Sequence, residues 1–281
     1  MPLLAKRLFL HALPLFPNQR KPCLFAMRIA TWNVNSLKVR LPHVLDWLGT
    51  ADCDVLCLQE TKLTDDKFPK AELDAAGYSV AFTGQKTYNG VAILSRLPLE
   101  NVVADLPDFT DPQKRVIAAS VNDVRIVCAY FPNGQALDSD KYRYKLDWLD
   151  AMQGYVKTLL SSHQHVALLG DYNIAPEDRD VHDPAAWAGQ ILVSPPERAH
   201  FEALKAQGLT DCFRLFEQPE RTFSWWDYRM LGFRRNAGMR IDHILASASL
   251  AASCRTCVID KAPRKREQPS DHTPVMADFS I

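Results

Sequence analysis

The sequence predicts an α+β sandwich built as one domain, and three observations support this fold class. Short apolar strands recur along the chain between turn residues, whereas only two segments carry a clear helical pattern. Many strands follow one another without an intervening helix, which argues against a parallel βαβ repeat. No linker rich in Pro, Gly or Ser divides residues 27–281, so we expect a single domain there.

The individual elements follow from local patterns. Strands are predicted, in chain order, over 28–34, 55–58, 78–83, 90–95, 115–121, 124–130, 165–170, 222–225, 240–246, 255–260 and 275–279. Asn122-Asp123 is a two-residue turn, so the strands on either side of it should form a hairpin. Apolar residues at helical spacing predict a long helix over 141–161. Ser194-Pro195-Pro196-Glu197 is a capping box that begins a second helix, and Gly208 ends it.

Composition excludes several classes of protein. The chain has 33 Lys+Arg and 33 Asp+Glu, so it does not coat nucleic acid through bulk positive charge. No apolar run approaches the roughly 20 residues that a bilayer-spanning helix needs. Seven cysteines are scattered along the chain, and the CxxC pair of Cys254 and Cys257 has no second pair to complete a zinc site. We therefore expect a reduced, cytoplasmic protein.

The first 26 residues differ in composition from the rest. They include four basic residues and no acidic one, and a short apolar stretch among them is interrupted by His11 and Pro14. The small-residue cleavage pattern of a signal peptide does not precede Met27. We expect residues 1–26 to be an N-terminal extension that is disordered or that reflects a start codon upstream of the natural one.

Acids, amides and one imidazole end or follow the predicted strands. The set consists of Asn33, Asn35, Glu60, Asp171, Asn173, Asp242, Asp271 and His272. Taken singly, such residues are usually turn formers or helix caps. Asp242 is harder to explain in this way, because an unpaired carboxylate inside an apolar strand is costly. Gathered at one end of a sandwich, the segments would form a pocket of carboxylates, amides and an imidazole.

This donor set suits one kind of chemistry. Hard oxygen ligands favour Mg²⁺ or Mn²⁺, and no HExxH motif or His-rich cluster supports a zinc hydrolase. Glu60 is the natural primary metal ligand, a second acid could deprotonate a water molecule, and His272 could meet the charge that builds on phosphoryl oxygens. Asp242 is the candidate that fixes the tautomer of His272. The sequence thus predicts metal-assisted phosphodiester hydrolysis.

Eight stretches closely resemble the exonuclease III family of apurinic/apyrimidinic (AP) endonucleases, part of the endonuclease/exonuclease/phosphatase superfamily. They are, in the family's order, TWNVNSLKVR, LCLQETK, GQKTYNGVAILS, AYFPNG, LLGDYNIAP, FSWWDYR, RIDHILAS and PSDHTPV. The resemblance covers residues 27–279 and implies that 27–281 form the catalytic domain. It implies a DNase I-like, four-layered α/β sandwich, in which two mixed, mostly antiparallel sheets pack face to face between helices.

The resemblance also implies roles for the hydrolytic residues. Glu60 would bind Mg²⁺, with Asn33 and Asp271 near the metal. The implied catalytic positions are Asp171, which activates the attacking water, Asn173, which positions Asp171 and the phosphate, His272 paired with Asp242, and Tyr130, which reaches the same phosphate or activates the nucleophile.

Further residues are expected to contact DNA. Arg115 precedes a strand and could hold a phosphate as a guanidinium fork. The other expected contacts to DNA or to the abasic sugar are Asn35, Asn133, Lys145, Trp225 and Trp226. The Trp side chains would wall a pocket for a sugar that lacks its base, although alternation along a strand predicts that one of the two faces the core. His182 lies in a loop that could narrow this pocket, or it is simply a surface residue.

The resemblance implies a Mg²⁺-dependent hydrolase of base excision repair, with Mn²⁺ as a substitute, that acts as a monomer on double-stranded DNA. It would cut 5′ to abasic sites and also show 3′-phosphodiesterase, 3′-phosphatase and 3′→5′ exodeoxyribonuclease activity. Two alternatives stay open. One is a superfamily member that acts on another phosphoester, such as an inositol phosphate or sphingomyelin, and the other is a non-catalytic DNA-binding module with the same fold.

Overall fold

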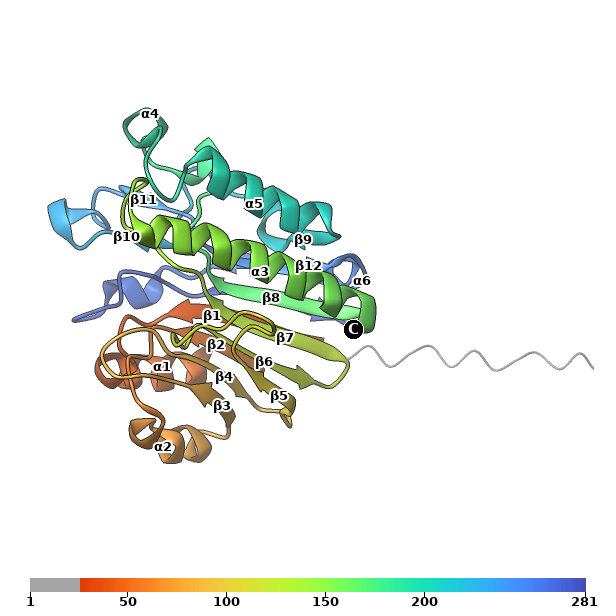
Figure 1. The fold of residues 1–281 in the computed structure, drawn as a ribbon. Coiled ribbons are helices and arrows are strands. Elements are labelled where there is room, and N and C mark those ends of the chain that lie inside the picture. The colour runs from red at the N-terminus through yellow and green to blue at the C-terminus, as the bar shows by residue number, and fades with distance from the viewer. Residues whose placement is uncertain (1–25) are drawn as a thin grey trace, which may run out of the picture.

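The computed structural model describes residues 26–281, and two six-stranded sheets form its centre (Figure 1). The extension expected at residues 1–26 lies outside the described residues, except for Ala26, which begins the first strand. The part of the chain that the structure describes contains no helix long and apolar enough to cross a membrane.

The first sheet has the strand order β13-β14-β1-β2-β4-β3. Its strands are β1 (Ala26–Asn33), β2 (Val55–Gln59), β3 (Ser79–Thr83), β4 (Val91–Ser95), β13 (Cys254–Ile259) and β14 (Val275–Ser280). Strand β1 pairs parallel with β2, and the other neighbours in this sheet pair antiparallel. The sheet is therefore mixed and mostly antiparallel.

The second sheet has the order β5-β6-β7-β8-β12-β9. Its strands are β5 (Glu100–Ala104), β6 (Val116–Val121), β7 (Val124–Tyr130), β8 (His165–Asp171), β9 (Leu209–Asp211) and β12 (Asp242–Ser247). Here β7 and β8 form the parallel pair, and β6 and β7 form the hairpin predicted at Asn122-Asp123. A separate two-stranded ribbon joins β10 (Trp225–Trp226) to β11 (Gly238–Met239).

Helices cover the outer faces of the two sheets (Figure 1). The α-helices are α1 (Leu37–Ala51), α2 (Lys70–Ala75), α3 (Asp140–Ser162), α4 (Pro184–Trp187), α5 (Pro195–Ala206) and α6 (Ala248–Ala252). Five 3₁₀ turns complete the described chain: η1 (Asp65–Lys67), η2 (Asp178–Asp180), η3 (Cys212–Leu215), η4 (Arg229–Leu231) and η5 (Ala262–Lys265). With helices outside and sheets inside, the molecule has four layers, as the sequence resemblance implied.

The central strands are apolar on both faces because both faces are buried. In β1, Met27 and Ile29 face the core between the sheets, whereas Ala30 and Trp32 face α1. Strand β7 shows the same alternation between the inter-sheet core and the layer formed by α3 and α5. Successive strand side chains point to opposite faces, so a strand buried on both sides must be apolar throughout.

Some elements differ from those predicted. The strand expected at 222–225 is only the short strand Trp225–Trp226, and α1, with Pro42 in its interior, was not predicted. Strand β5 was also missed, because every residue of this edge strand is exposed and no apolar alternation marks it. The predicted capping box is present at α5, where Ser194 and Glu197 bond reciprocally.

Strand registers bring the polar strand ends to one end of the sandwich. Asn33 lies opposite Gln59 at the carboxyl ends of the parallel strands β1 and β2, and Glu60 directly follows Gln59. Tyr130 lies opposite Asp171 at the carboxyl ends of β7 and β8, and β12 begins with Asp242 opposite Asp171. Both sheets therefore present their functional side chains at a common edge.

Candidate active site

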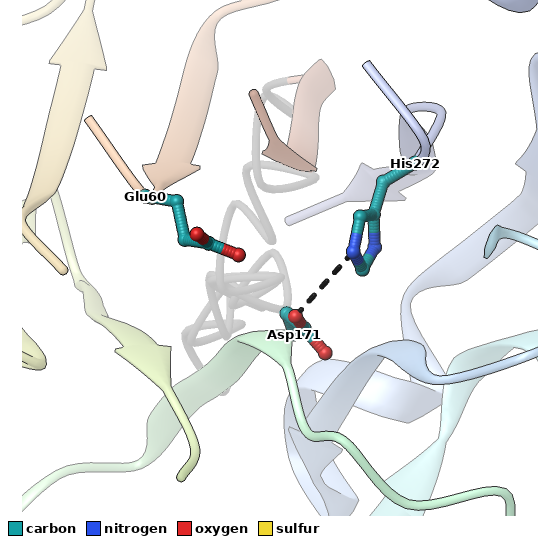
Figure 2. Close-up of side chains that lie close together, drawn as sticks. All are labelled: Glu60, Asp171 and His272. Carbon is teal, nitrogen blue, oxygen red and sulfur yellow. Dashed lines mark ion pairs between the residues drawn. The ribbon is translucent and has the colours of Figure 1, made fainter. Parts of the chain in front are cut away.

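Asn33 joins the two sheets at the centre of the site. Its Nδ2 donates to Glu60 Oε1 and to Asp171 Oδ2, both at 2.9 Å, and its side chain is fully buried. Figure 2 shows the Glu60 and Asp171 side chains converging from different strands on the space beside His272. One amide thus holds the carboxylates of both sheets at a common cavity.

His272 is oriented by a carboxylate. Its Nδ1 lies 2.9 Å from Asp242 Oδ2, and the Ser224 hydroxyl donates to the same oxygen at 2.6 Å. The hydrogen bond at Nδ1 leaves Nε2 pointing toward Asp171, whose Oδ2 lies 3.7 Å away (Figure 2). The predicted pairing of Asp242 with His272 is present, and Ser224 is a supporting residue that sequence reasoning missed.

The surroundings of His272 and Asp171 shift the pKa values of both groups. Burial alone would lower the pKa of His272, but the carboxylates of Asp242 and Asp171 outweigh it and raise the pKa to about 10. Burial raises the pKa of Asp171 to about 7, while the His272 imidazolium and the Asn33 amide oppose that rise. The site therefore holds an imidazolium and a carboxylate that can take up a proton near neutral pH.

Asn173 supports Asp171 from its own loop. The Asn173 backbone N–H donates to Asp171 Oδ1 at 2.9 Å, and Asn173 Nδ2 donates to the Phe131 carbonyl at 3.0 Å. Asn133 Nδ2 in turn donates to Asn173 Oδ1 at 3.0 Å. Asn173 has a φ of 49°, a left-handed conformation that Asn tolerates better than most residues. The structure thus brings Asn133 to the site as a supporting residue.

Tyr130 and Arg115 line a neighbouring cavity of about 500 Å³. Burial, with Glu60 and Asp171 nearby, raises the pKa of Tyr130, which keeps the phenol protonated. The Arg115 guanidinium lies 4.8 Å over the Tyr130 ring, and its Nε has no hydrogen-bond partner in the described chain. Arg115 is 9% exposed and lines the wall of this cavity as a largely buried cation, with Nη1 donating to the Tyr130 carbonyl at 3.3 Å and Nη2 to Gln113 Oε1 at 2.8 Å.

Asp271 lies at the other side of the site. Its Oδ1 accepts from Asn35 Nδ2 at 2.9 Å and its Oδ2 from Trp225 Nε1 at 3.0 Å. Burial alone would raise the pKa of the Asp271 carboxyl. The charge of His272 and the hydrogen bonds from Asn35 and Trp225 outweigh burial and lower this pKa. Lys62 connects this side to Glu60, since its Nζ lies 2.9 Å from Glu60 Oε2 and donates to Asn35 Oδ1 at 2.5 Å.

Trp225 and His182 share a smaller cavity of about 370 Å³ beside the site. The Trp225 ring centroid is 6.5 Å from that of His272, and the ring is partly exposed. The His182 backbone N–H donates to the Gly238 carbonyl at 3.0 Å, which fixes the loop that carries it. The expectation that the loop of His182 lies near the Trp225 pocket is thereby confirmed.

Two predicted DNA contacts are corrected by the structure. Trp226 is fully buried, packs against Phe233 and donates from Nε1 to Asn236 Oδ1, so it belongs to the interior. Lys145 is also fully buried and pairs with Glu197. Alternation along the strand turns Trp226 inward, and α5 covers the side of α3 on which Lys145 lies. Neither side chain can reach DNA.

The donor atoms at the centre fit a divalent metal ion. Atoms of Glu60, Asp171 and His272 lie within 4.8 Å of one another, and of these the two carboxylates can bind a cation, because the protonated His272 ring has no lone pair to offer. Carboxylate oxygens dominate this set, and they suit a hard cation. The Lys62 ammonium lies 2.9 Å from Glu60 Oε2, so a cation at Glu60 would share this carboxylate with Lys62. Asp271 is linked to Glu60 only indirectly, through Asn35 and Lys62.

Comparison with known proteins agrees with this geometry. Residues 30–272 match the endonuclease/exonuclease/phosphatase family. The chain belongs to this family. Exodeoxyribonuclease III of Haemophilus influenzae is 35% identical over 267 residues, which cover 90% of this chain and 100% of that protein.

Solved structures of the family confirm the predicted fold. A 3′ phosphatase, NExo, from Neisseria, bound to a product DNA hairpin, is 46% identical with a TM-score of 0.89, covering 91% of this chain and 100% of that one. An AP endonuclease from Archaeoglobus fulgidus is 38% identical with a TM-score of 0.88, again covering 91% and 100%. The four-layered sandwich is thus the fold of the exonuclease III branch of the family.

Proposed function

We propose that this protein is a Mg²⁺-dependent DNA repair nuclease that cuts the phosphodiester 5′ to an abasic site and also trims blocked 3′ ends. Membership of a family of DNA exonucleases and AP endonucleases supports the reaction class. The observation that carries the proposal is the convergence of Glu60, Asp171 and the His272–Asp242 pair on one cavity. We further propose that the protein acts as a cytoplasmic monomer.

The side chains divide the hydrolysis among them. Asp171, held by Asn33 and Asn173, accepts a proton from the attacking water. The His272 imidazolium, kept charged by Asp242, donates a hydrogen bond to the scissile phosphate as negative charge develops. Glu60, with Asn33 beside it, would hold a Mg²⁺ ion, which supplies charge neutralisation at a phosphoryl oxygen.

Two cavities flank the reacting phosphate and suggest how DNA is held. The Arg115 guanidinium lines one of these cavities and suits a backbone phosphate next to the scissile one, because a guanidinium binds phosphate through its N–H groups. The partly exposed Trp225 ring suits an extrahelical sugar without a base. This arrangement favours DNA over a lipid or inositol phosphate as the substrate.

A digest of matched DNA duplexes tests the proposal. The substrates carry an abasic-site analogue, a 3′-phosphate or an intact recessed 3′ end, and each is incubated with Mg²⁺, with Mn²⁺ or with EDTA. We expect cleavage 5′ to the abasic analogue, removal of the 3′-phosphate, and no reaction in EDTA. His272→Asn, purified in parallel, controls for contaminating nucleases.

Each other outcome selects a different function. Removal of 3′-phosphate without abasic-site cleavage would restrict the enzyme to trimming 3′ ends. Turnover of inositol phosphates or sphingomyelin in preference to DNA would favour the other phosphoesterase activities of the superfamily. Tight binding of the abasic duplex without Mg²⁺-dependent cleavage would indicate a non-catalytic module.

A further inference from the structure

A fully buried ion pair lies behind the active site, between α3 and α5. Lys145 Nζ on α3 is 2.5 Å from Glu197 Oε1 on α5, and both side chains have no exposed surface. Burial lowers the pKa of Lys145, and the Glu197 carboxylate opposes that effect. Two charges taken out of water carry a large desolvation penalty, so a pair retained in such a place invites a functional explanation.

The Lys145 ammonium does more than neutralise Glu197. It donates to the backbone carbonyl of Asn173 at 2.7 Å and to that of Asn133 at 3.3 Å. Its three protons therefore have three acceptors, and two of these belong to loops of the active site. An apolar side chain of the same length could fill the space but could not hold either carbonyl.

Glu197 fixes the ammonium from the opposite side. Its Oε1 also accepts from the Leu192 backbone N–H at 3.1 Å, and its Oε2 accepts from the Ser194 N–H at 3.0 Å and from the Ser194 hydroxyl at 2.6 Å. Tyr142 of α3 shares a hydrogen bond with the same Ser194 hydroxyl at 2.6 Å. The carboxylate is thus locked by the start of α5, and the ammonium is locked by the carboxylate.

The two residues whose carbonyls accept from Lys145, Asn133 and Asn173, are connected by hydrogen bonds to Asp171, the base of the proposed reaction. Asn133 and Asn173 are bonded to each other through their side chains at 3.0 Å. Asn173 then donates its backbone N–H to Asp171 Oδ1 at 2.9 Å. The left-handed backbone of Asn173 needs support from its surroundings, and its carbonyl bond to Lys145 supplies it.

From this chain of contacts we propose that Lys145 and Glu197 are positioning residues for hydrolysis, which hold Asn133 and Asn173 so that Asp171 keeps its orientation. The inference rests on the proposed function, since it assigns the base to Asp171. Neither residue touches the reacting atoms. The pair would therefore act on the rate of the chemical step and leave DNA binding largely intact.

The test compares two double variants. Lys145→Met/Glu197→Gln removes both buried charges while the new amide oxygen can still accept from the Ser194 N–H and hydroxyl at the start of α5. Arg28→Met/Asp278→Leu removes another ion pair, of 2.6 Å, near the start of β1 and away from the active site. Steady-state kinetics on the preferred duplex and amide hydrogen exchange are measured for both variants and the wild type.

We expect kcat of Lys145→Met/Glu197→Gln to fall at least tenfold with KM within about threefold of wild type. Hydrogen exchange should become faster in peptides that cover residues 131–135 and 171–175. The control variant should keep the wild-type kcat and the slow exchange of these peptides, even if its melting temperature falls as much as that of Lys145→Met/Glu197→Gln. Wild-type kcat or unchanged exchange in Lys145→Met/Glu197→Gln would overturn the proposal.

A milder variant covers the case in which the double variant does not fold. Glu197→Asp keeps the charge but withdraws the carboxylate by one methylene, which draws the ammonium away from the two carbonyls. A smaller fall in kcat with unchanged KM is expected, and wild-type kcat would contradict the proposal. The hydrogen-exchange measurement does not depend on any substrate. If the wild-type protein cleaves no duplex, the proposed function fails, whereas the exchange data still decide whether the pair holds these loops.

Discussion

The charge on His272 is made by its neighbours. Asp242 and Asp171 together overcome the effect of burial and raise the pKa of His272 to about 10, so the imidazolium persists through the neutral range. Ser224 holds Asp242 in turn. A hydrogen-bond donor that stays charged at working pH suits a phosphate that gains negative charge in the transition state.

Replacing Asp242 should reveal this dependence. In Asp242→Asn the main carboxylate that raises the pKa of His272 is lost, so the pKa of His272 should fall. The basic limb of the pH–rate profile should then move to lower pH, and kcat at pH 8 should drop by about 10²-fold or more. An NMR titration of His272 checks the pKa directly. An unmoved basic limb together with an unmoved His272 resonance would contradict this account of the site.

Removal of the central groups should abolish the reaction without unfolding the protein. Glu60→Gln and His272→Asn each delete one charge from the cavity, and we expect either to lower kcat by about 10²–10³-fold or more on the abasic duplex. Circular dichroism and the melting temperature should stay close to those of the wild type. Normal cleavage rates in both folded variants would refute the catalytic assignment.

At the scale of single elements, strand β8 depends on a glycine. Gly170 has a φ of +154°, and a Cβ built on it would lie 1.8 Å from the Ala129 carbonyl oxygen of β7. Since this contact is with backbone, the paired strands would have to separate. Gly170 pairs with Ala129 directly before the pair of Asp171 and Tyr130, so a side chain at Gly170 would also displace these two site residues.

Two glycine-to-alanine substitutions, one at a crowded position and one at an open position, test whether β8 requires a glycine. Gly170→Ala should lower the free energy of unfolding by about 3 kcal/mol or more, because overlap with backbone cannot be relieved by a rotamer change. Gly154→Ala, in the exposed middle of α3 with open space at its Cβ, should raise it by roughly 0.5–1 kcal/mol. Urea denaturation of both variants checks the comparison, and equal effects would show that β7 and β8 do not approach as closely as described.

At the scale of the whole molecule, a buried network joins the second sheet to the loops around the site. Arg240 is fully buried, donates to Asp180 of η2 at 2.7 Å, and lies 2.8 Å from Asp211 of β9. It also contacts His243 Nδ1 at 2.9 Å. Burial and the Arg240 charge lower the pKa of His243 to about 4, so the folded protein keeps this imidazole neutral.

Global stability should consequently depend on pH through His243. The unfolded chain takes up a proton near pH 6.5 and the folded chain only near pH 4, so the unfolded state binds more protons between these values. The free energy of unfolding should therefore decrease as the pH falls from 6.5 to 4, by up to roughly 3 kcal/mol from this residue. Urea denaturation at pH 7 and pH 4.5 measures the decrease. His243→Gln should show a smaller decrease, and an identical one would exclude His243 as its source.

The sequence by itself determined most strands of the two sheets, the long helix and the residues of the central site. Apolar alternation and turn residues are local properties, so β7, β8 and α3 could be predicted to within a few residues. The convergence of Glu60, Asp171 and His272 could be predicted too, because acids, amides and an imidazole occur together at the ends of several predicted strands and lie in stretches that resemble one family. These inferences needed only the order of residues along short segments.

Only the tertiary structure decided how deeply particular side chains are buried and which partners they find. Lys145 reads as a surface cation on its own helix, yet it is enclosed because Glu197, 52 residues away, packs over it. The burial of Trp226, next to the partly exposed Trp225, also depends on the segments that cover it. The same holds for helix α1, which forms despite its internal Pro42. Burial and charge pairing are set by segments far apart in the chain, and no local pattern records those distances.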